Sequence, residues 1–233
     1  MKAIILAAGA GSRFGSLTKD NHKPLLEICG IPIIEKQIQI LNKNKISNIT
    51  IVTGYMSDLL ESKISNYKIN FVHNEIYKNT DTLYSFWCAR NSFDDDVLCL
   101  YGDLIFEDEI ISNILDTDFD ICLAVRHLGK TLDNHTVFTN NKIVKRINVN
   151  LSTEQVNGQY IGITKYSLNS MTTIKQILSE FYAQNDLLGE IVRIYEKLLN
   201  DGYCINASFT KNLKWFNINN ITSLELARKF FCN

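Results

Sequence analysis

The amino-acid sequence predicts an α/β fold whose core is a mixed, mostly parallel sheet flanked by helices. Short apolar runs of strand length alternate with segments of helical periodicity through the first half of the chain. Strands that alternate with helices form parallel βαβ units with right-handed crossovers. A chain of 233 residues, 45% of them hydrophobic, is long enough to bury the core of such a domain.

The predicted elements alternate regularly as far as residue 115 and less regularly beyond it. Strands are expected at residues 4–6, 49–53, 69–73 and 97–101, and helices at 33–41, 57–64, 82–91 and 107–115. Further strands are expected at 119–125, 136–138, 143–147 and 159–163, with helices at 174–182 and 190–199. Because we find no repeat, low-complexity tract or linker, we predict one domain, 1–233, with a core at 1–127 and a second part at 128–233.

Composition and charge argue against several classes of protein. The net charge of −1 gives no reason to expect a nucleic-acid partner. No segment approaches the length of a membrane span, and the apolar stretch at residues 3–8 is too short for a signal peptide. We therefore predict a cytoplasmic protein without a membrane partner. The six cysteines lack any Cys-x-x-Cys pair and are expected to be reduced thiols, with no disulfide or zinc: Cys29, Cys88, Cys99, Cys122, Cys204 and Cys232.

A glycine-rich segment follows the first predicted strand and is followed in turn by Lys23-Pro24. Glycines let the backbone turn sharply, and their N–H groups can point at phosphate oxygens. Arg13 and Lys23 add two cations near the same place. The combination predicts a nucleoside triphosphate held by its phosphates, with contacts from the loop residues Leu6, Ala8, Gly9, Ala10, Gly11 and Ser12.

Two other kinds of glycine loop do not fit this segment. A Walker loop requires a lysine and a hydroxyl residue after its glycines, and Gly15-Ser16 lacks the lysine. A dinucleotide fingerprint requires a third glycine where Phe14 stands.

Asp103 ends the strand expected at 97–101 and is the main candidate for a metal ligand. An aspartate just past a strand can also be a simple helix cap. Ligands on parallel sheets bind beyond the carboxyl ends of the strands, where the glycine loop also lies. Because Mg²⁺ prefers one or two carboxylates together with phosphate oxygens and water, the metal role is favoured.

These residues resemble the signature of the nucleotidyltransferases that activate sugar phosphates and small alcohol phosphates, from Lys2 to about Arg228. The resemblance implies a Rossmann-like fold in which residues 1–127 bind the nucleotide and 128–233 form an acceptor-side subregion that closes the site. It also implies that Arg13 faces the leaving pyrophosphate, that Lys23 faces the reacting phosphates and that Asp103 binds Mg²⁺. Catalytic roles are therefore expected for Arg13, Lys23 and Asp103.

The segment Trp215-Phe216-Asn217-Ile218-Asn219 resembles the closing motif of that family, in which acidic residues stand near the metal. This chain has Asn217 and Asn219 instead. Amide oxygens can bind Mg²⁺ but supply no charge, so the metal would be held more weakly or with more water. The alternative is that both asparagines only make hydrogen bonds within a loop.

The stretch from Asn74 to Ser85 resembles the phosphocholine-type cytidylyltransferases within the same family. Asn74 and Thr80 carry amide and hydroxyl groups suited to the edge of a pyrimidine. The resemblance implies that this pyrimidine nucleotide is CTP. The resemblance places Glu190 near a cationic acceptor group, and such a group also favours aromatic faces such as Tyr160 and Trp215.

The predicted activity is transfer of CMP from CTP to a small organic phosphate, with release of pyrophosphate. The acceptor is expected to be phosphocholine-like or phosphoglutamine, and the resemblance implies a role in capsule or cell-surface polysaccharide synthesis. Two alternatives stay open. One is a hexose-1-phosphate nucleotidyltransferase, and the other is a relative that binds nucleotide as a regulator without catalysis.

Overall fold

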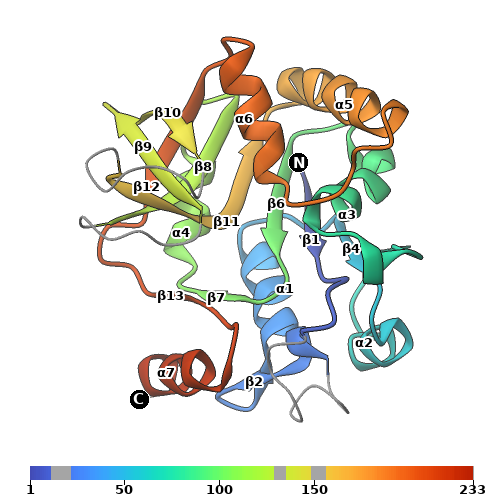
Figure 1. Cartoon of the computed structure of the whole chain (residues 1–233). Helices are drawn as coiled ribbons and strands as arrows, with labels where there is room; N and C mark the ends of the chain where they lie inside the picture. The colour runs from blue at the N-terminus through green and yellow to red at the C-terminus, as the bar shows by residue number, and fades with distance from the viewer. Residues whose placement is uncertain (12–21, 129–134, 148–155, 233) are drawn as a thin grey trace.

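A nine-stranded mixed sheet forms the centre of the computed structural model, which describes residues 1–11, 22–128, 135–147 and 156–232. The strands lie in the order β5-β4-β1-β6-β11-β8-β12-β10-β9, with a further pairing between β11 and β9. Figure 1 shows the sheet running from β4 and β1 on one side to β9 and β10 on the other, with helices around it. This architecture confirms the predicted α/β class and the mixed sheet. The sheet is not mostly parallel, however, because its strand pairings among the described residues are four parallel and five antiparallel.

The first four strands of the sheet are parallel and match the predicted alternation. They are β1 (Lys2–Leu6), β4 (Ile49–Thr53), β5 (Ile69–His73) and β6 (Val97–Tyr101). The helices between and after them are α1 (Ile33–Lys43), α2 (Ser57–Lys63), α3 (Thr82–Cys88) and α4 (Glu109–Leu115). All residues of β4 and β6 are buried, as expected for apolar strands covered on both faces.

The second half of the chain completes the same sheet instead of forming a separate one. Its strands are β8 (Ile121–His127), β9 (Thr136–Asn140), β10 (Ile143–Ile147), β11 (Gly158–Tyr166) and β12 (Ile205–Phe209). Strand β11 pairs antiparallel with both β6 and β8, so it joins the two halves of the chain at the middle of the sheet. Helices α5 (Leu168–Ala183) and α6 (Val192–Asn200) follow it.

Several elements have no counterpart among the predicted ones. Short strands β7 (Leu104–Phe106) and β13 (Trp215–Asn217) pair with each other, and β2 (Glu27–Ile28) pairs with β3 (Ile31–Pro32). Single turns of 3₁₀ helix cover Lys23–Leu25, Tyr77–Asn79 and Arg90–Ser92. The last helix, α7 (Ile221–Phe231), lies beside β2 at the bottom of the view, away from α5 and α6 (Figure 1).

A second, smaller apolar cluster attaches α7 to the rest of the molecule. Ile28, Ile105, Ile218 and Leu224 are buried there together, whereas the main core lies along the sheet. A disulfide between Cys29 and Cys232 joins the β2–β3 turn to the end of α7. The prediction that all six cysteines are free thiols is therefore wrong for these two residues. Sequence spacing could not show the pair, because 203 positions separate the two cysteines.

No helix among the described residues is both long enough and apolar enough to cross a membrane. The absence of a membrane partner and the cytoplasmic location stay predictions.

The glycine at position 162 gives a test of how β11 packs against β6. Gly162 has φ +90° at an irregularity in β11, and a Cβ built there would lie 2.7 Å from a ring carbon of Tyr101. We expect Gly162→Ala to lower the free energy of unfolding by about 2–4 kcal/mol, since steric strain adds to backbone strain. Chemical denaturation measures this loss.

Gly202→Ala is the matched control, because Gly202 has φ +84° but no atom within 4 Å of its built Cβ. It should lose only the backbone component, about 1–2 kcal/mol. Equal losses in the two variants would contradict the close packing of β11 on Tyr101.

Candidate active site

The candidate active site lies where two neighbouring parallel strands end. Strands β1 and β6 pair along their whole length, from Lys2 opposite Val97 to Leu6 opposite Tyr101. Just beyond them, the N–H of Gly102 donates to the carbonyl of Leu6 over 2.9 Å. A cleft of about 800 Å³ opens at this edge and is lined by both chain segments that follow the strands. The position agrees with the general rule for ligands on parallel sheets.

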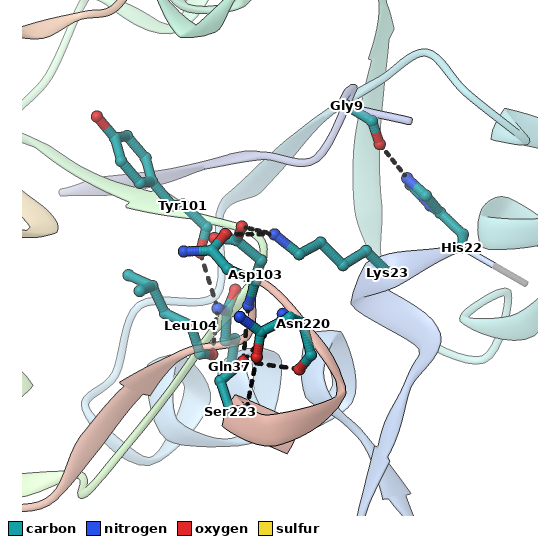
Figure 2. Close-up of polar contacts among 10 residues, drawn as sticks. Gly9, His22, Lys23, Gln37, Tyr101, Asp103, Leu104, Asn220 and Ser223 are labelled. Carbon is teal, nitrogen blue, oxygen red and sulfur yellow. Dashed lines mark hydrogen bonds and ion pairs between the residues drawn. The ribbon is translucent and has the colours of Figure 1, made fainter. Parts of the chain in front are cut away.

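Lys23 and Asp103 form an ion pair at the centre of this cleft. The Lys23 ammonium donates to a carboxylate oxygen of Asp103 and, over 2.9 Å, to the amide oxygen of Asn219. Figure 2 shows the Lys23 side chain extended from its 3₁₀ turn towards Asp103. The two charged side chains are only 12% and 23% exposed, so solvent screens the pair weakly. Residues that the sequence predicted separately are thus brought together.

A buried glutamine holds the turn that carries Asp103. The amide nitrogen of Gln37, on α1, donates to the carbonyl of Tyr101 over 2.9 Å and to the carbonyl of Leu104 over 2.7 Å (Figure 2). The Asp103 carbonyl in turn accepts from the N–H of Ile218 over 2.9 Å. Asp103 is therefore fixed from the helix side and from the closing segment. Sequence reasoning missed Gln37, since its role depends on a contact across 64 positions.

The closing segment reaches the site because β13 pairs antiparallel with β7. Asn217 lies opposite Leu104, and Leu104 is the residue that directly follows Asp103. Past the strand, the hydroxyl of Ser223 accepts from the N–H groups of Asn219 and Asn220 at 2.9 and 3.0 Å. The Asn220 side chain caps α7 by accepting from the N–H of Ser223. These bonds hold Asn219 beside Lys23.

Oxygen donors suited to Mg²⁺ are present in the site. Asp103 supplies a carboxylate, and the amide oxygen of Asn217 is buried without a hydrogen-bond partner in the described part of the chain. The side-chain oxygen of Asn219 accepts a hydrogen bond from the Lys23 ammonium, which also binds Asp103, so this oxygen lies close to the carboxylate. Carboxylate, amide and phosphate oxygens together form the donor set that Mg²⁺ prefers, so the residues fit such an ion. Within the described ranges no cluster of three or more His, Cys, Asp or Glu side chains forms a metal site.

The glycine loop also lines the cleft. Leu6, Gly9, Ala10 and Gly11 line the cleft, whereas Ala8 is buried and its carbonyl accepts from the N–H of Tyr55 over 3.0 Å. Gly11 has φ +62°, a conformation that favours glycine. The predicted nucleotide contacts of Ser12 and Arg13 fall outside the described residues.

Asn74 and Thr80, the predicted pyrimidine contacts, differ in position. Thr80 lines the cleft. Asn74 is 1% exposed and lies behind the lining, where its amide nitrogen donates to Thr80 and Ser85 and its oxygen accepts from Ile76. The geometry therefore gives Asn74 a supporting role, since its side chain holds Thr80 in the cleft wall. A base contact by either residue stays a prediction.

The three predicted acceptor contacts, Tyr160, Glu190 and Trp215, all line the same cleft. Tyr160 is 2% exposed, and its hydroxyl bonds within a buried group made with Thr164 and Tyr195. A Glu190 carboxylate oxygen lies 2.5 Å from the Nε2 atom of His135. Burial holds the pKa of the Tyr160 hydroxyl well above its usual value, so the group stays neutral. Tyr160 therefore contributes an uncharged surface to the cleft.

Arg126 is a further residue of the cleft lining, which the sequence did not indicate. It projects from β8, and its Nε atom donates to the side-chain oxygen of Gln159 over 2.6 Å. The guanidinium lies 5.5 Å from the centre of the Trp215 ring. Arg126 and Glu190 both line the cleft, so the part near the predicted acceptor contacts carries charges of both signs.

The comparisons with known proteins agree with this geometry. Residues 3–163 match the MobA-like NTP transferase domain, which is well over half of the chain. The chain therefore belongs to this nucleotidyltransferase family, and the predicted resemblance is confirmed. Two solved structures share the fold over 98% of this chain, with TM-scores of 0.83 and 0.80 at 17% and 20% identity. They are a CTP:phosphocholine cytidylyltransferase from Streptococcus pneumoniae and an inositol-1-phosphate CTP transferase from T. maritima.

Two relatives are similar in sequence. The choline-phosphate cytidylyltransferase of Haemophilus influenzae is 43% identical over 95 residues, which span 41% of each chain. The CTP:phosphoglutamine cytidylyltransferase of Campylobacter jejuni is 29% identical over 206 residues, covering 81% of this chain and 79% of that protein. The match to the Haemophilus influenzae protein thus covers less than half of the length of that protein.

Gln37 gives a test of how the Asp103 turn is held. Gln37→Met keeps the length of the side chain but removes the donor to two buried carbonyls. We expect a loss of about 1–3 kcal/mol in the free energy of unfolding, and a lower turnover because Asp103 loses one of its two supports. Denaturant unfolding and the rate at saturating substrate measure the two effects.

Gln39→Met on the same helix is the control. Among the described residues, the hydrogen bond of the Gln39 side chain is a long, exposed one of 3.4 Å to Tyr67, so this change should alter neither quantity. Unchanged turnover in a folded Gln37→Met protein would contradict the positioning role of Gln37.

Proposed function

We propose that this protein is a CTP-dependent cytidylyltransferase, which transfers CMP from CTP to a small phosphorylated metabolite and releases pyrophosphate. The observation that carries the proposal is the meeting of Lys23, Asp103 and Asn219 at the ends of β1 and β6, beside the glycine loop. A cation, a carboxylate and loop N–H groups on one cleft suit a triphosphate and its metal. The cytidylyltransferases among its relatives support the choice of nucleotide.

The reaction needs no dedicated base in the protein. A phosphate oxygen of the acceptor attacks the α-phosphorus of CTP, and the bond from that phosphorus to the pyrophosphate oxygen breaks in line. The acceptor phosphate already carries negative charge near neutral pH, because its second pKa is about 6. Catalysis therefore reduces to positioning and to neutralisation of charge. Lys23 neutralises charge on the reacting phosphates, and Arg13 is proposed to hold the departing pyrophosphate.

A magnesium ion would be held by Asp103, with amide oxygens of Asn217 or Asn219 and the phosphates of CTP completing its shell. When bound, such an ion neutralises phosphate charge and orients the triphosphate. The Lys23 ammonium lies between Asp103 and Asn219, so its position orders both proposed ligands.

The acceptor half of the cleft favours a small molecule that carries more than a phosphate and a neutral sugar. Glu190 suits a cationic group, as does the face of Trp215, and Arg126 suits an anionic group. The cationic group of a phosphocholine-like acceptor would meet Glu190 and Trp215. A phosphoglutamine-like acceptor has an amino group for these residues and, in addition, a carboxylate for Arg126. Supply of such activated groups to cell-surface polymers stays part of the proposal.

Pyrophosphate release tests the function directly. We expect release with CTP but little with UTP, dTTP, ATP or GTP, and with phosphocholine or phosphoglutamine in preference to glucose 1-phosphate. Preference for UTP or dTTP with glucose 1-phosphate would support the hexose-1-phosphate alternative. CTP binding without release for any acceptor would support a regulator.

The Lys23 ammonium should matter for the rate, and its loss also leaves Asp103 without its ion-pair partner. We expect Lys23→Met to reduce turnover by about a hundredfold or more, as for the loss of a preorganised charge stabiliser. Lys43→Met is the control, because Lys43 pairs with Asp108 at an exposed site outside the cleft and should keep its activity. Near wild-type turnover of Lys23→Met at saturating CTP would refute the role of Lys23.

The two asparagines can be tested by restoring charge. The Coulomb attraction between a carboxylate and Mg²⁺ in a partly buried cleft is on the order of several kcal/mol, before the cost of desolvation is subtracted. Asn217→Asp or Asn219→Asp should therefore lower the Mg²⁺ concentration that gives half-maximal activity. The KM for the acceptor is measured in parallel, because a rise there would place the asparagine against the acceptor. If neither titration moves, both residues are structural.

A further inference from the structure

His22 is a fully buried histidine directly before Lys23, with 0% of its surface exposed. It is not part of the cleft lining and lies behind the glycine loop. Its Nε2 atom is 3.3 Å from the carbonyl oxygen of Gly9 (Figure 2). Both the phosphate-binding loop and the lysine of the site therefore meet at this one side chain.

The contact with Gly9 fixes the protonation of the ring. A carbonyl oxygen can only accept a hydrogen bond, so Nε2 must carry the proton. The other nitrogen, Nδ1, is buried without a hydrogen-bond partner in the described residues, and a proton there would be left without an acceptor. Burial agrees with this, because it lowers the pKa of His22 to about 4. The ring is neutral at the pH where phosphates react.

A carbonyl held on one side of a peptide fixes the N–H on the other. In a trans peptide, the C=O of Gly9 and the N–H of Ala10 point in opposite directions, and no cis peptide occurs in the described chain. His22 draws the Gly9 oxygen to the buried side. The Ala10 N–H therefore points away from His22, towards the cleft that Gly9 and Ala10 line.

Packing among the described residues does not fix this peptide. A Cβ built on Gly9 would have no atom of the described residues within 4 Å, so these neighbours do not hold its conformation. Glycine also rotates more freely than any other residue. The imidazole is itself held in place, since the Tyr55 ring lies edge-on to it at 6.0 Å between centroids. The Tyr55 N–H in turn donates to the carbonyl of Ala8 over 3.0 Å.

We propose that His22 is a positioning residue whose neutral imidazole aims the Ala10 N–H at the phosphates that leave as pyrophosphate. The proposal rests on the proposed function, because it needs a triphosphate in the cleft. His22 does not touch the substrate and moves no proton. It acts by fixing one peptide plane before the nucleotide arrives, which avoids the cost of ordering a glycine loop during binding.

The test compares His22→Gln with His22→Met. The two side chains have similar length, but only glutamine carries an N–H that can reach the Gly9 oxygen. Binding of CTP, pyrophosphate and CMP is measured by calorimetry, without turnover. We expect His22→Met to bind CTP and pyrophosphate about tenfold more weakly and CMP unchanged, as for one lost hydrogen bond to a charged group. His22→Gln should recover most of the affinity.

Equal affinities in all three proteins would overturn the proposal, as would a loss that includes CMP and is not recovered by glutamine. Should His22→Met fail to fold, the ¹⁵N NMR shifts of the wild-type ring decide. A neutral ring protonated at Nε2 supports the proposal, and a ring that is charged or protonated at Nδ1 at pH 7 refutes it. A wild-type protein that binds neither CTP nor pyrophosphate would refute the proposed function itself.

Discussion

The site depends on one partly buried ion pair, between Lys23 and Asp103, which joins segments 80 positions apart. Each partner needs the other, because a single charge left in this half-buried position would be poorly solvated. The surrounding structure serves to hold both ends. The turn with Pro24 supports Lys23, and Gln37 together with Ile218 supports the turn of Asp103. Removing the pair would leave these supports in place but without the charges that they position.

The ion pair can form because β1 and β6 are direct neighbours in the sheet. Parallel strands send their carboxyl ends to the same edge, so the segments after Leu6 and after Tyr101 meet there. The closing segment comes from the far end of the chain, and β13 delivers it by pairing with β7. The small apolar cluster beneath α7 and the disulfide to Cys232 anchor that segment. A distant part of the sequence thus completes a site that the first half begins.

The sequence predicted best what local patterns encode. The strands β1, β4, β5 and β6 are short apolar or β-branched runs, and their ends place Gly9 and Asp103 correctly. Strands β7 and β13 were not predicted, because a strand of three residues is too short to show a periodic pattern. Each is a strand because it pairs with the other. His22, Gln37 and Arg126 escaped for a related reason. A polar residue in an apolar or mixed segment reveals its role only when its partner, far away in the chain, is known.

The balance of charge at the centre explains how the site can work with asparagines in its closing segment. Lys23 and Asp103 together are neutral, and Asn219 adds an oxygen without charge. A carboxylate in its place would compete with Asp103 for the same ammonium and would add one negative charge where the proposed triphosphate would bind. The amides avoid that repulsion at the expense of attraction for a cation. Under the proposed function, Lys23 and the loop N–H groups would hold the phosphates, and the nucleotide would supply much of the coordination of a bound metal ion.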